Sequence, residues 1–200
     1  ACGIHPVLTL PVSLDVGTDN HALLDDALYL GYRAPRLRGA AYDAFVEAFV
    51  QGVHEVWPGC LIQFEDFKQH IALRLLDRYR ARIPCFNDDV QGTAAVVLSG
   101  VLAGLRHLGA AWEDQRVVLA GSGAAGIGIG RLLRLAMLRS GMAEADVRRA
   151  LVMVDTRGLV HDARGELDDD KRELAYPAAA ATDAGLVLAA HGREEHPGLL

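Results

Sequence analysis

The sequence has 200 residues, a formal net charge of −6, and hydrophobic and charged shares of 51% and 23%, which is typical of a water-soluble chain with one or two globular domains. Acidic and basic residues are interspersed, so no basic stripe favours a nucleic-acid partner. No run of about 18 uncharged apolar residues predicts a membrane span, and the N-terminal residues lack a signal-peptide pattern. The three cysteines, Cys2, Cys60 and Cys85, form no CxxC pair. We therefore expect neither a disulfide framework nor a zinc site, and a reducing, cytoplasmic location.

The first part of the chain predicts one strand and two helices. Residues Leu8–Val16 alternate and are rich in valine and leucine, which favours a strand. Asp19 or Asn20 can cap a short helix. Apolar residues recur at helical spacing from Tyr42 to Trp57 and predict an amphipathic helix, which the following proline-glycine pair ends.

Strands and helices alternate in the rest of the chain. Cys60–Phe64 predicts a buried strand, Lys68–Arg82 a helix and Pro84–Phe86 a short extended segment, after which a long apolar helix is expected over Gln91–Leu108. The later expected elements are a strand at Arg116–Ala120, a helix to about Ser140, a short helix within Gly141–Arg149 and a strand at Leu151–Asp155. This alternation predicts an α/β fold, with a parallel sheet covered by helices on both faces.

A glycine-rich turn follows the expected strand at Arg116–Ala120. It consists of Gly121, Ser122, Gly123, Ala124, Ala125 and Gly126. In this GxGxxG pattern, Gly121 allows a tight turn, Gly123 lets a pyrophosphate approach the backbone, and Gly126 lets the helix pack closely on the strand. The N–H groups and dipole at the start of the helix favour phosphate. The turn therefore predicts a dinucleotide site, although such a turn can also bind nothing.

Asp155 ends the next expected strand and can accept hydrogen bonds from the adenosine ribose. It lies 29 residues after Gly126, which is more than the usual spacing of about 20, and the short helix before it accounts for the excess. Asp155 favours NAD. Arg157, Lys171 and Arg172 could instead meet the 2′-phosphate of NADP, or simply be solvated surface charges, so the choice stays open.

Two acidic pairs flank the expected helix at Lys68–Arg82. Glu65 and Asp66 follow one strand, and Asp88 and Asp89 precede a helix. Ligands of parallel α/β sheets bind at the carboxyl ends of strands, and Glu65 and Asp66 can face one ion only if the strand ends there. Converging carboxylates favour Mg²⁺ or Mn²⁺. Helix capping with surface charge, or a general acid/base pair as in glycosidases, would fit the same spacing.

Five segments resemble the malic enzyme family, in the family's order. They are LDVGTDN at 14–20, LYLG at 28–31, IQFEDF at 62–67, FNDDVQGTAA at 86–95 and VDTRGL at 154–159. The resemblance extends from Ala1 to about Leu174. It implies that residues 1–87 are part of a substrate- and metal-binding domain, and that residues 88–200 are the N-terminal part of a Rossmann-type NAD(P)-binding domain.

The resemblance also implies roles for individual residues. Glu65, Asp66 and Asp89 would ligate Mg²⁺ or Mn²⁺, and Asp88 would lie just behind them as an orienting carboxylate. The glycine-rich turn and Asp155 would bind NAD or NADP.

The implied reaction is metal-dependent oxidation of malate at carbon 2 by NAD(P)⁺, followed by loss of CO₂ to give pyruvate. The family's tyrosine acid, lysine base and substrate-binding arginine have no counterpart in these residues. We therefore expect an internal piece of a longer protein, inactive alone, whose parent forms a homodimer or homotetramer. Two alternatives are a non-catalytic dinucleotide-binding or regulatory domain, and a two-carboxylate hydrolase with an unrelated glycine turn.

Overall fold

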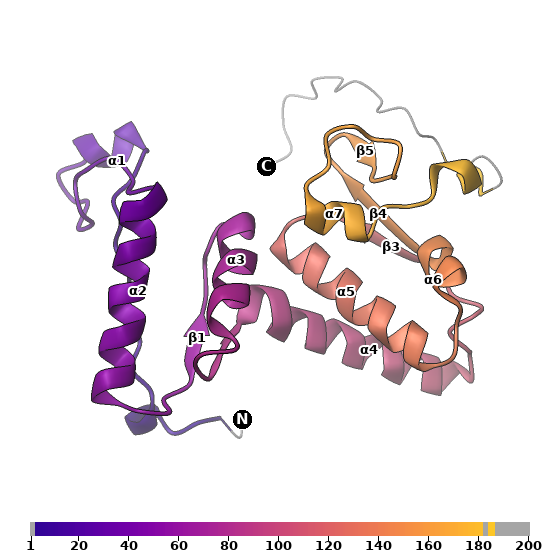
Figure 1. The fold of residues 1–200 in the computed structure, drawn as a ribbon, viewed down its shortest axis with the longest axis horizontal. Helices are drawn as coiled ribbons and strands as arrows, with labels where there is room; N and C mark the ends of the chain where they lie inside the picture. Colours follow the sequence, from indigo (N-terminus) through magenta and orange to yellow (C-terminus); the bar gives the residue numbers. More distant parts are fainter. Residues whose placement is uncertain (1–2, 182–183, 187–200) are drawn as a thin grey trace. The chain divides into compact units, whose positions relative to one another are not determined.

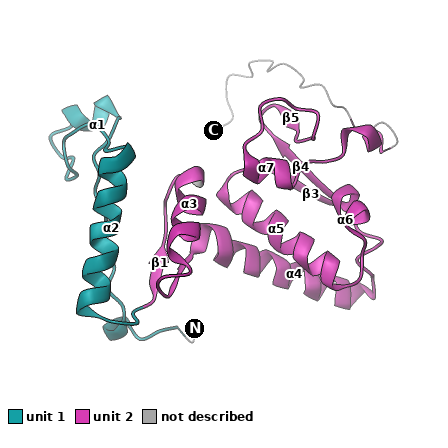
Figure 2. Ribbon diagram, in the orientation of Figure 1, with its two compact units in different colours: residues 1–60 teal, residues 61–200 magenta. Residues whose placement is uncertain are grey.

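The structure is a computed structural model that describes residues 3–181 and 184–186. The chain separates into two compact units, residues 1–60 and 61–200 (Figure 2). The domain boundary expected near Asn87 stays a prediction. Among the helices described, none combines the length and the apolar character that crossing a membrane requires.

The first unit contains a 3₁₀ turn, η1 (Pro6–Leu8), and two helices, α1 (His21–Asp25) and α2 (Gly39–Val56). The Asn20 side chain accepts a hydrogen bond from the N–H of Ala22, which confirms the expected cap. Helix α2 begins before the predicted start and buries one face, formed by Tyr42, Val46 and Val50, whose fourfold spacing places them in one stripe.

The strand predicted at Leu8–Val16 is wrong. Leu8 is 77% exposed, and Leu10 and Val12 are also exposed. A strand needs a neighbouring strand to receive its backbone hydrogen bonds. Among the described residues of this unit there is no strand. At the end of the segment the Val16 carbonyl accepts from the Leu37 N–H at 2.7 Å, a contact between loops. The alternating pattern therefore gives an extended segment without a sheet.

The second unit opens with a strand–helix–strand arrangement. Strand β1 (Ile62–Phe64) and strand β2 (Cys85–Asn87) pair in parallel, joined through helix α3 (Gln69–Tyr79). In this register Phe64 lies beside Asn87. The two strands therefore end at the same edge, and the acidic pairs that follow them are brought together.

A π-helical turn, η2 (Asp88–Gly92), separates β2 from helix α4 (Thr93–Leu108). The sequence predicted a regular helix from Gln91 and did not reveal this turn. The π-helical bond of this turn runs from the N–H of Thr93 to the Asp88 carbonyl, and the Asn87 side chain caps the start of the turn by accepting a hydrogen bond of 3.0 Å from the N–H of Val90. Wide turns of this kind occur frequently at functional sites.

The remaining strands form a second sheet (Figure 1). Strand β3 (Val117–Ala120) pairs in parallel with β4 (Leu151–Asp155), and β5 (Gly158–Leu159) pairs antiparallel with β4. The connection holds helix α5 (Ala124–Arg139) and helix α6 (Glu144–Ala150), and the later elements are α7 (Asp169–Glu173) and η3 (Ala178–Ala180). The parallel strands, the glycine turn and the helix after it confirm the expected α/β, Rossmann-like fold; the β5 hairpin was not predicted.

The core of this sheet lies on the face covered by α4 and α5. Leu133 and Met137 of α5 pack there with Val117 of β3 and Leu151 of β4. On the opposite face Val152 of β4 is buried, but Val118 of β3 is 63% exposed. The expected cover on both faces is therefore incomplete at β3, since no described helix packs against Val118.

Candidate functional site

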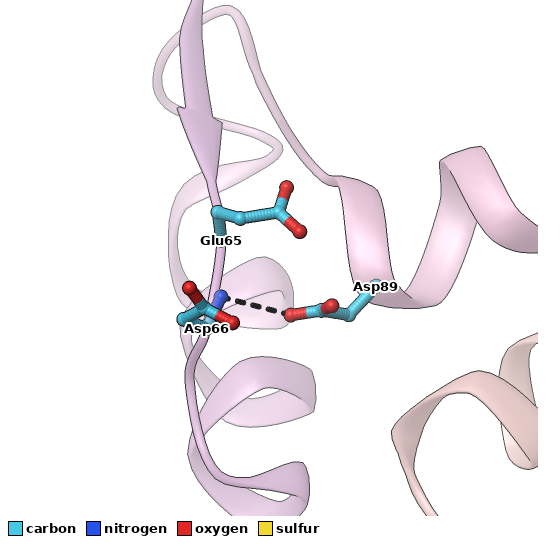
Figure 3. A group of neighbouring side chains, drawn as sticks. All are labelled: Glu65, Asp66 and Asp89. Carbon is cyan, nitrogen blue, oxygen red and sulfur yellow. Dashed lines mark hydrogen bonds between the residues drawn. The ribbon is translucent and has the colours of Figure 1, made fainter. Parts of the chain in front are cut away.

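Three carboxylates from two segments converge at the edge where β1 and β2 end (Figure 3). One oxygen from each of Glu65, Asp66 and Asp89 can be chosen so that all three lie within 4.8 Å of one another. The main-chain N–H of Asp66 donates a hydrogen bond of 2.9 Å to Oδ2 of Asp89. The segments after the two strands are thus joined directly at the cluster.

The backbone at Asp66 explains how two consecutive residues contribute to one cluster. Neighbouring side chains of a strand point to opposite faces, but β1 ends at Phe64, and Asp66 adopts a left-handed conformation with φ +60°. Aspartate tolerates this conformation better than most residues. The turn therefore brings the Asp66 carboxylate close to that of Glu65, as the sequence argument required.

The electrostatics of the cluster disfavour additional negative charge. A hydrogen bond from Gln63 lowers the pKa of Glu65, but desolvation and the nearby carboxylates of Asp89 and Asp88 outweigh it, and the pKa lies above its ordinary value. Asp88 thus acts on the cluster through its charge. Its side chain lies against Gly92, where a Cβ atom would be only 1.7 Å from Oδ1.

The donor set fits a divalent cation. Hard cations such as Mg²⁺ and Ca²⁺ bind oxygen at about 2.0–2.6 Å, so ligand atoms on one ion lie within about 5 Å of each other, as these oxygens do. A cation would also relieve the repulsion that raises the pKa of Glu65. Glu65 and Asp66 are exposed and Asp89 is half-buried, which leaves the cluster accessible to solvent.

The glycine-rich turn has the expected geometry. Gly121 has φ +134°, which favours glycine, and its N–H donates to the Val154 carbonyl at 2.9 Å. A Cβ atom at Gly126 would lie 2.2 Å from the Gly121 carbonyl oxygen, so helix α5 begins in close contact with the turn. Gly123 has open space around it, which leaves its backbone accessible to a ligand.

A groove of about 430 Å³ connects the carboxylate cluster to this helix. Its walls are formed by Asp66, Phe67, Lys68, Asp89, Ala124 and Ala125. Asp66 and Asp89 therefore face a common space with the first turn of α5, in which one small molecule can touch both sides.

Asp155 ends β4 and is held by three cationic or N–H partners. Arg164 donates to both carboxylate oxygens at 3.1 Å, the Arg157 N–H donates to Oδ1 at 2.9 Å, and Lys171 Nζ lies 3.5 Å from Oδ2. The side chain is only 11% exposed. Burial raises its pKa, but the hydrogen bonds and the charge of Arg164 outweigh burial and hold the pKa below its ordinary value.

The basic residues considered for a 2′-phosphate all have partners in the protein. Arg157 pairs with Glu166 at 2.6 Å, Lys171 with Asp155, and Arg172 donates to the Leu167 carbonyl at 3.3 Å. Arg157 is exposed, whereas Lys171 is largely enclosed. Arg157 thus forms an ion pair at the surface, whereas Lys171 is held beside Asp155.

Two residues of the site were not identified from the sequence. Arg164 carries the bidentate pair to Asp155, and no periodicity marks it because it lies in a loop. Asn87 is completely buried, caps the N–H of Val90 through Oδ1, and has no hydrogen-bond partner for Nδ2 among the described residues. An asparagine directly before an acidic pair and a helix is the local signal that could have indicated it.

Comparison with known protein families gives two matches along the chain. The malic enzyme N-terminal domain matches residues 1–80, and the malic enzyme NAD binding domain matches residues 90–191. The chain belongs to the malic enzyme family. The expected membership in the malic enzyme family is thereby confirmed.

Individual malic enzymes are similar along most of the chain. The NAD-dependent malic enzyme of Sodalis glossinidius is 48% identical over 184 residues, or 92% of this chain and 33% of that protein. NAD-dependent malic enzyme 2 of Photobacterium profundum is 45% identical over 183 residues, which are 91% of this chain and 33% of that protein. The chain therefore spans about a third of the length of these curated relatives.

Solved malic enzyme structures have the same fold. The Entamoeba histolytica malic enzyme matches with a TM-score of 0.55 and 29% identity, over 68% of this chain and 26% of that one. The NAD-dependent malic enzyme from Thermotoga maritima matches with a TM-score of 0.51 and 28% identity, over 71% of this chain and 36% of that one.

Proposed function

We propose that the protein containing this chain catalyses the oxidative decarboxylation of (S)-malate to pyruvate and CO₂, with NAD⁺ as oxidant and a divalent metal at the carboxylate cluster. The observation that carries the proposal is the groove shared by Asp66 and Asp89 with Ala124 and Ala125 of helix α5. A small acid bound between a metal and a dinucleotide needs this juxtaposition. Relatives named NAD-dependent malic enzymes support it.

Glu65, Asp66 and Asp89 would hold Mg²⁺ or Mn²⁺, because their oxygens are close together and crowded with negative charge. The bound metal would supply Lewis acidity, which polarises the carbon 2 oxygen of the substrate and stabilises negative charge during the loss of CO₂. Asp88 adds charge beside the ligands. Phe67, with the alanines of α5, would give the groove an apolar wall beside the bound substrate.

The glycine-rich turn would bind the pyrophosphate of the cofactor. The backbone of Gly123 is accessible, and the N–H groups at the start of α5 point toward that space as in other helix N-terminal phosphate sites. Asp155 would lie near the adenosine ribose. A ribose hydroxyl would compete with Lys171 for the Asp155 carboxylate. Of the four contacts that this carboxylate makes, the one to Lys171 is the longest.

Of the two nicotinamide cofactors we propose NAD. A 2′-phosphate would bring its charge close to the Asp155 carboxylate, and Arg157 already pairs with Glu166. The general acid and base of the reaction are assigned to parts of the protein beyond these 200 residues, in line with the family resemblance. We also propose a homodimer or homotetramer, as the same resemblance implies.

The test is an absorbance assay of NADH formation by the whole protein with L-malate and Mn²⁺, repeated with NADP⁺ and with EDTA. We expect reduction of NAD⁺ that stops with EDTA, and pyruvate as product. A folded protein that binds NADH but reduces no NAD⁺ with malate would instead support a non-catalytic dinucleotide-binding domain, and the acidic cluster would then be structural. The hydrolase alternative predicts no dinucleotide binding at all.

A further inference from the structure

Helix α5 contacts the π-helical turn η2 about one turn after its own start, two residues beyond the glycine-rich turn. At Gly128, a buried residue of α5, an added Cβ atom would lie 2.2 Å from the carbonyl oxygen of Val90 and 3.0 Å from its Cγ1 atom. The first distance is far shorter than a Cβ atom tolerates and involves backbone, whereas the second is tight but could be relieved by a small shift of the side chain. The backbone of η2 therefore packs directly against the Cα atom of Gly128, where no side chain intervenes.

Val90 has little freedom to move away from this contact. Its N–H donates to Oδ1 of the completely buried Asn87 at 3.0 Å. Its side chain is 5% exposed and packs in the same hydrophobic cluster as Ile127, the residue before Gly128. The Val90 peptide is thus held by the asparagine on one side and by α5 on the other.

Asp89 directly precedes Val90, so its position depends on this peptide. Its carboxylate accepts the hydrogen bond from the Asp66 N–H and belongs to the cluster with Glu65. The chain of contacts therefore runs from helix α5 through Val90 to a carboxylate of the cluster. Gly128 touches none of the three carboxylates itself.

We propose that Gly128 is a positioning residue for metal binding: by admitting the Val90 carbonyl against α5, it keeps the Asp89 carboxylate within reach of Glu65 and Asp66. The inference rests on the proposed function, because it assumes that the cluster binds a divalent cation. It adds a requirement that lies outside the glycine-rich turn and outside the ligands. A methyl group at position 128 would displace Val90, and Asp89 with it.

Gly130 offers a matched control on the same helix. An added Cβ atom there would lie 2.7 Å from Cδ1 of Leu174 and 3.1 Å from Cδ1 of Leu119, which are both the far ends of flexible side chains and not backbone. Gly130→Ala and Gly128→Ala thus introduce the same methyl group into the same buried helix. Only Gly128→Ala presses on the turn that carries Asp89.

The experiment measures Mn²⁺ affinity of the intact protein by electron paramagnetic resonance of the unbound ion, well below the melting temperature of each variant. We expect Gly128→Ala to raise the Mn²⁺ dissociation constant roughly tenfold or more, the range found when groups that support metal ligands are disturbed. Gly130→Ala should stay within about twofold of the unaltered protein, because a rotating leucine tip leaves the ligands in place.

Each outcome is decisive. Equal affinities for Gly128→Ala and the unaltered protein overturn the inference, and so does an equal loss in Gly130→Ala, which would indicate a general disturbance of α5. Failure of the unaltered protein to bind Mn²⁺ refutes the proposed function first. If Gly128→Ala is recovered unfolded, Asn87→Ala removes the acceptor that holds the same Val90 peptide without adding atoms, and unchanged Mn²⁺ affinity there overturns the inference.

Discussion

The main-chain N–H of Asp66 donates a hydrogen bond of 2.9 Å to the carboxylate of Asp89, a residue 23 positions later in the chain (Figure 3). The bond fixes one oxygen of Asp89 and leaves the other available. It also means that Asp89 has two functions, because it joins the segments after β1 and β2 and supplies charge to the cluster. Substitutions that remove charge can therefore be separated from those that remove the bond.

Removal of charge from the cluster should weaken metal binding while leaving the fold intact. Asp89→Asn keeps an acceptor for the Asp66 N–H but loses the negative charge. Glu65→Gln removes the carboxyl group whose pKa is raised by its neighbours. We expect each to lower Mn²⁺ affinity at least roughly tenfold, with melting temperatures of the metal-free protein equal or higher because repulsion falls. Isothermal titration and thermal melting measure the two effects. Asp114→Asn, at an exposed acid before β3, should change neither; unaltered affinity in both cluster variants would contradict the ligand assignment.

The glycines of the turn should separate cofactor binding from stability. Gly123 has open space around it, whereas a side chain at Gly126 would meet the Gly121 carbonyl oxygen. Gly123→Val should therefore keep its melting temperature but lose most NADH affinity, because the side chain fills the space for the pyrophosphate. Gly126→Val should lower the melting temperature as well. Fluorescence titration with NADH and thermal melting test this contrast, and full NADH affinity in Gly123→Val would show that the turn does not bind the cofactor.

Acid stability should depend on Asp155. Its pKa is lower in the folded protein because of Arg164, the Arg157 N–H and Lys171, so the ionised form stabilises the fold. This contribution is complete above the unfolded pKa of about 3.9 and is lost as the pH falls through the folded value. Melting temperatures measured between about pH 5 and pH 3 should therefore fall less steeply in Asp155→Asn than in the unaltered protein. Parallel curves for the two proteins would argue against a stabilising ionised Asp155.

The buried asparagine before η2 should matter more than an exposed cap. Asn87→Ala leaves the buried N–H of Val90 without its acceptor, which costs about 1–3 kcal/mol, and opens a small void in addition. Asn20→Ala removes a comparable cap at the start of α1, where water can replace it, and should cost about 1 kcal/mol or less. Urea unfolding gives both values. A larger loss in Asn20→Ala than in Asn87→Ala would mean that Asn87 does not hold the turn.

Much of the second unit could be predicted from the sequence, because its signals are local. Periodicity identified α4 and the parallel strands β3 and β4, and the glycine pattern identified the start of α5 together with the close approach at Gly126. The placement of the acidic pairs after two parallel strands indicated that they could converge at a common edge, whereas the choice of Glu65, Asp66 and Asp89 as ligands came from the family resemblance. Each of these features depends on residues that are close in sequence or follow a repeated spacing.

Features that depend on a distant partner could not be predicted. The alternating segment Leu8–Val16 has the pattern of a strand but no partner, and Arg164 becomes important only because the β5 hairpin returns it to Asp155. The π-helical turn likewise has no periodic signal, since its wide hydrogen bond from the Thr93 N–H to the Asp88 carbonyl leaves the local apolar pattern unchanged. The hydrophobic pattern predicts which face of an element is buried. It does not predict which partner a single polar side chain will hydrogen-bond to.

The left-handed backbone of Asp66 restricts which amino acids can occupy that position. Asparagine and glycine adopt φ +60° readily but bring no negative charge, whereas glutamate brings the charge but rarely adopts this conformation. Among the twenty amino acids, aspartate alone satisfies both conditions well. Any other amino acid at position 66 would therefore either distort the turn or remove negative charge from the cluster. Glu65 has no such backbone restriction, so aspartate could replace it without conflict with the backbone.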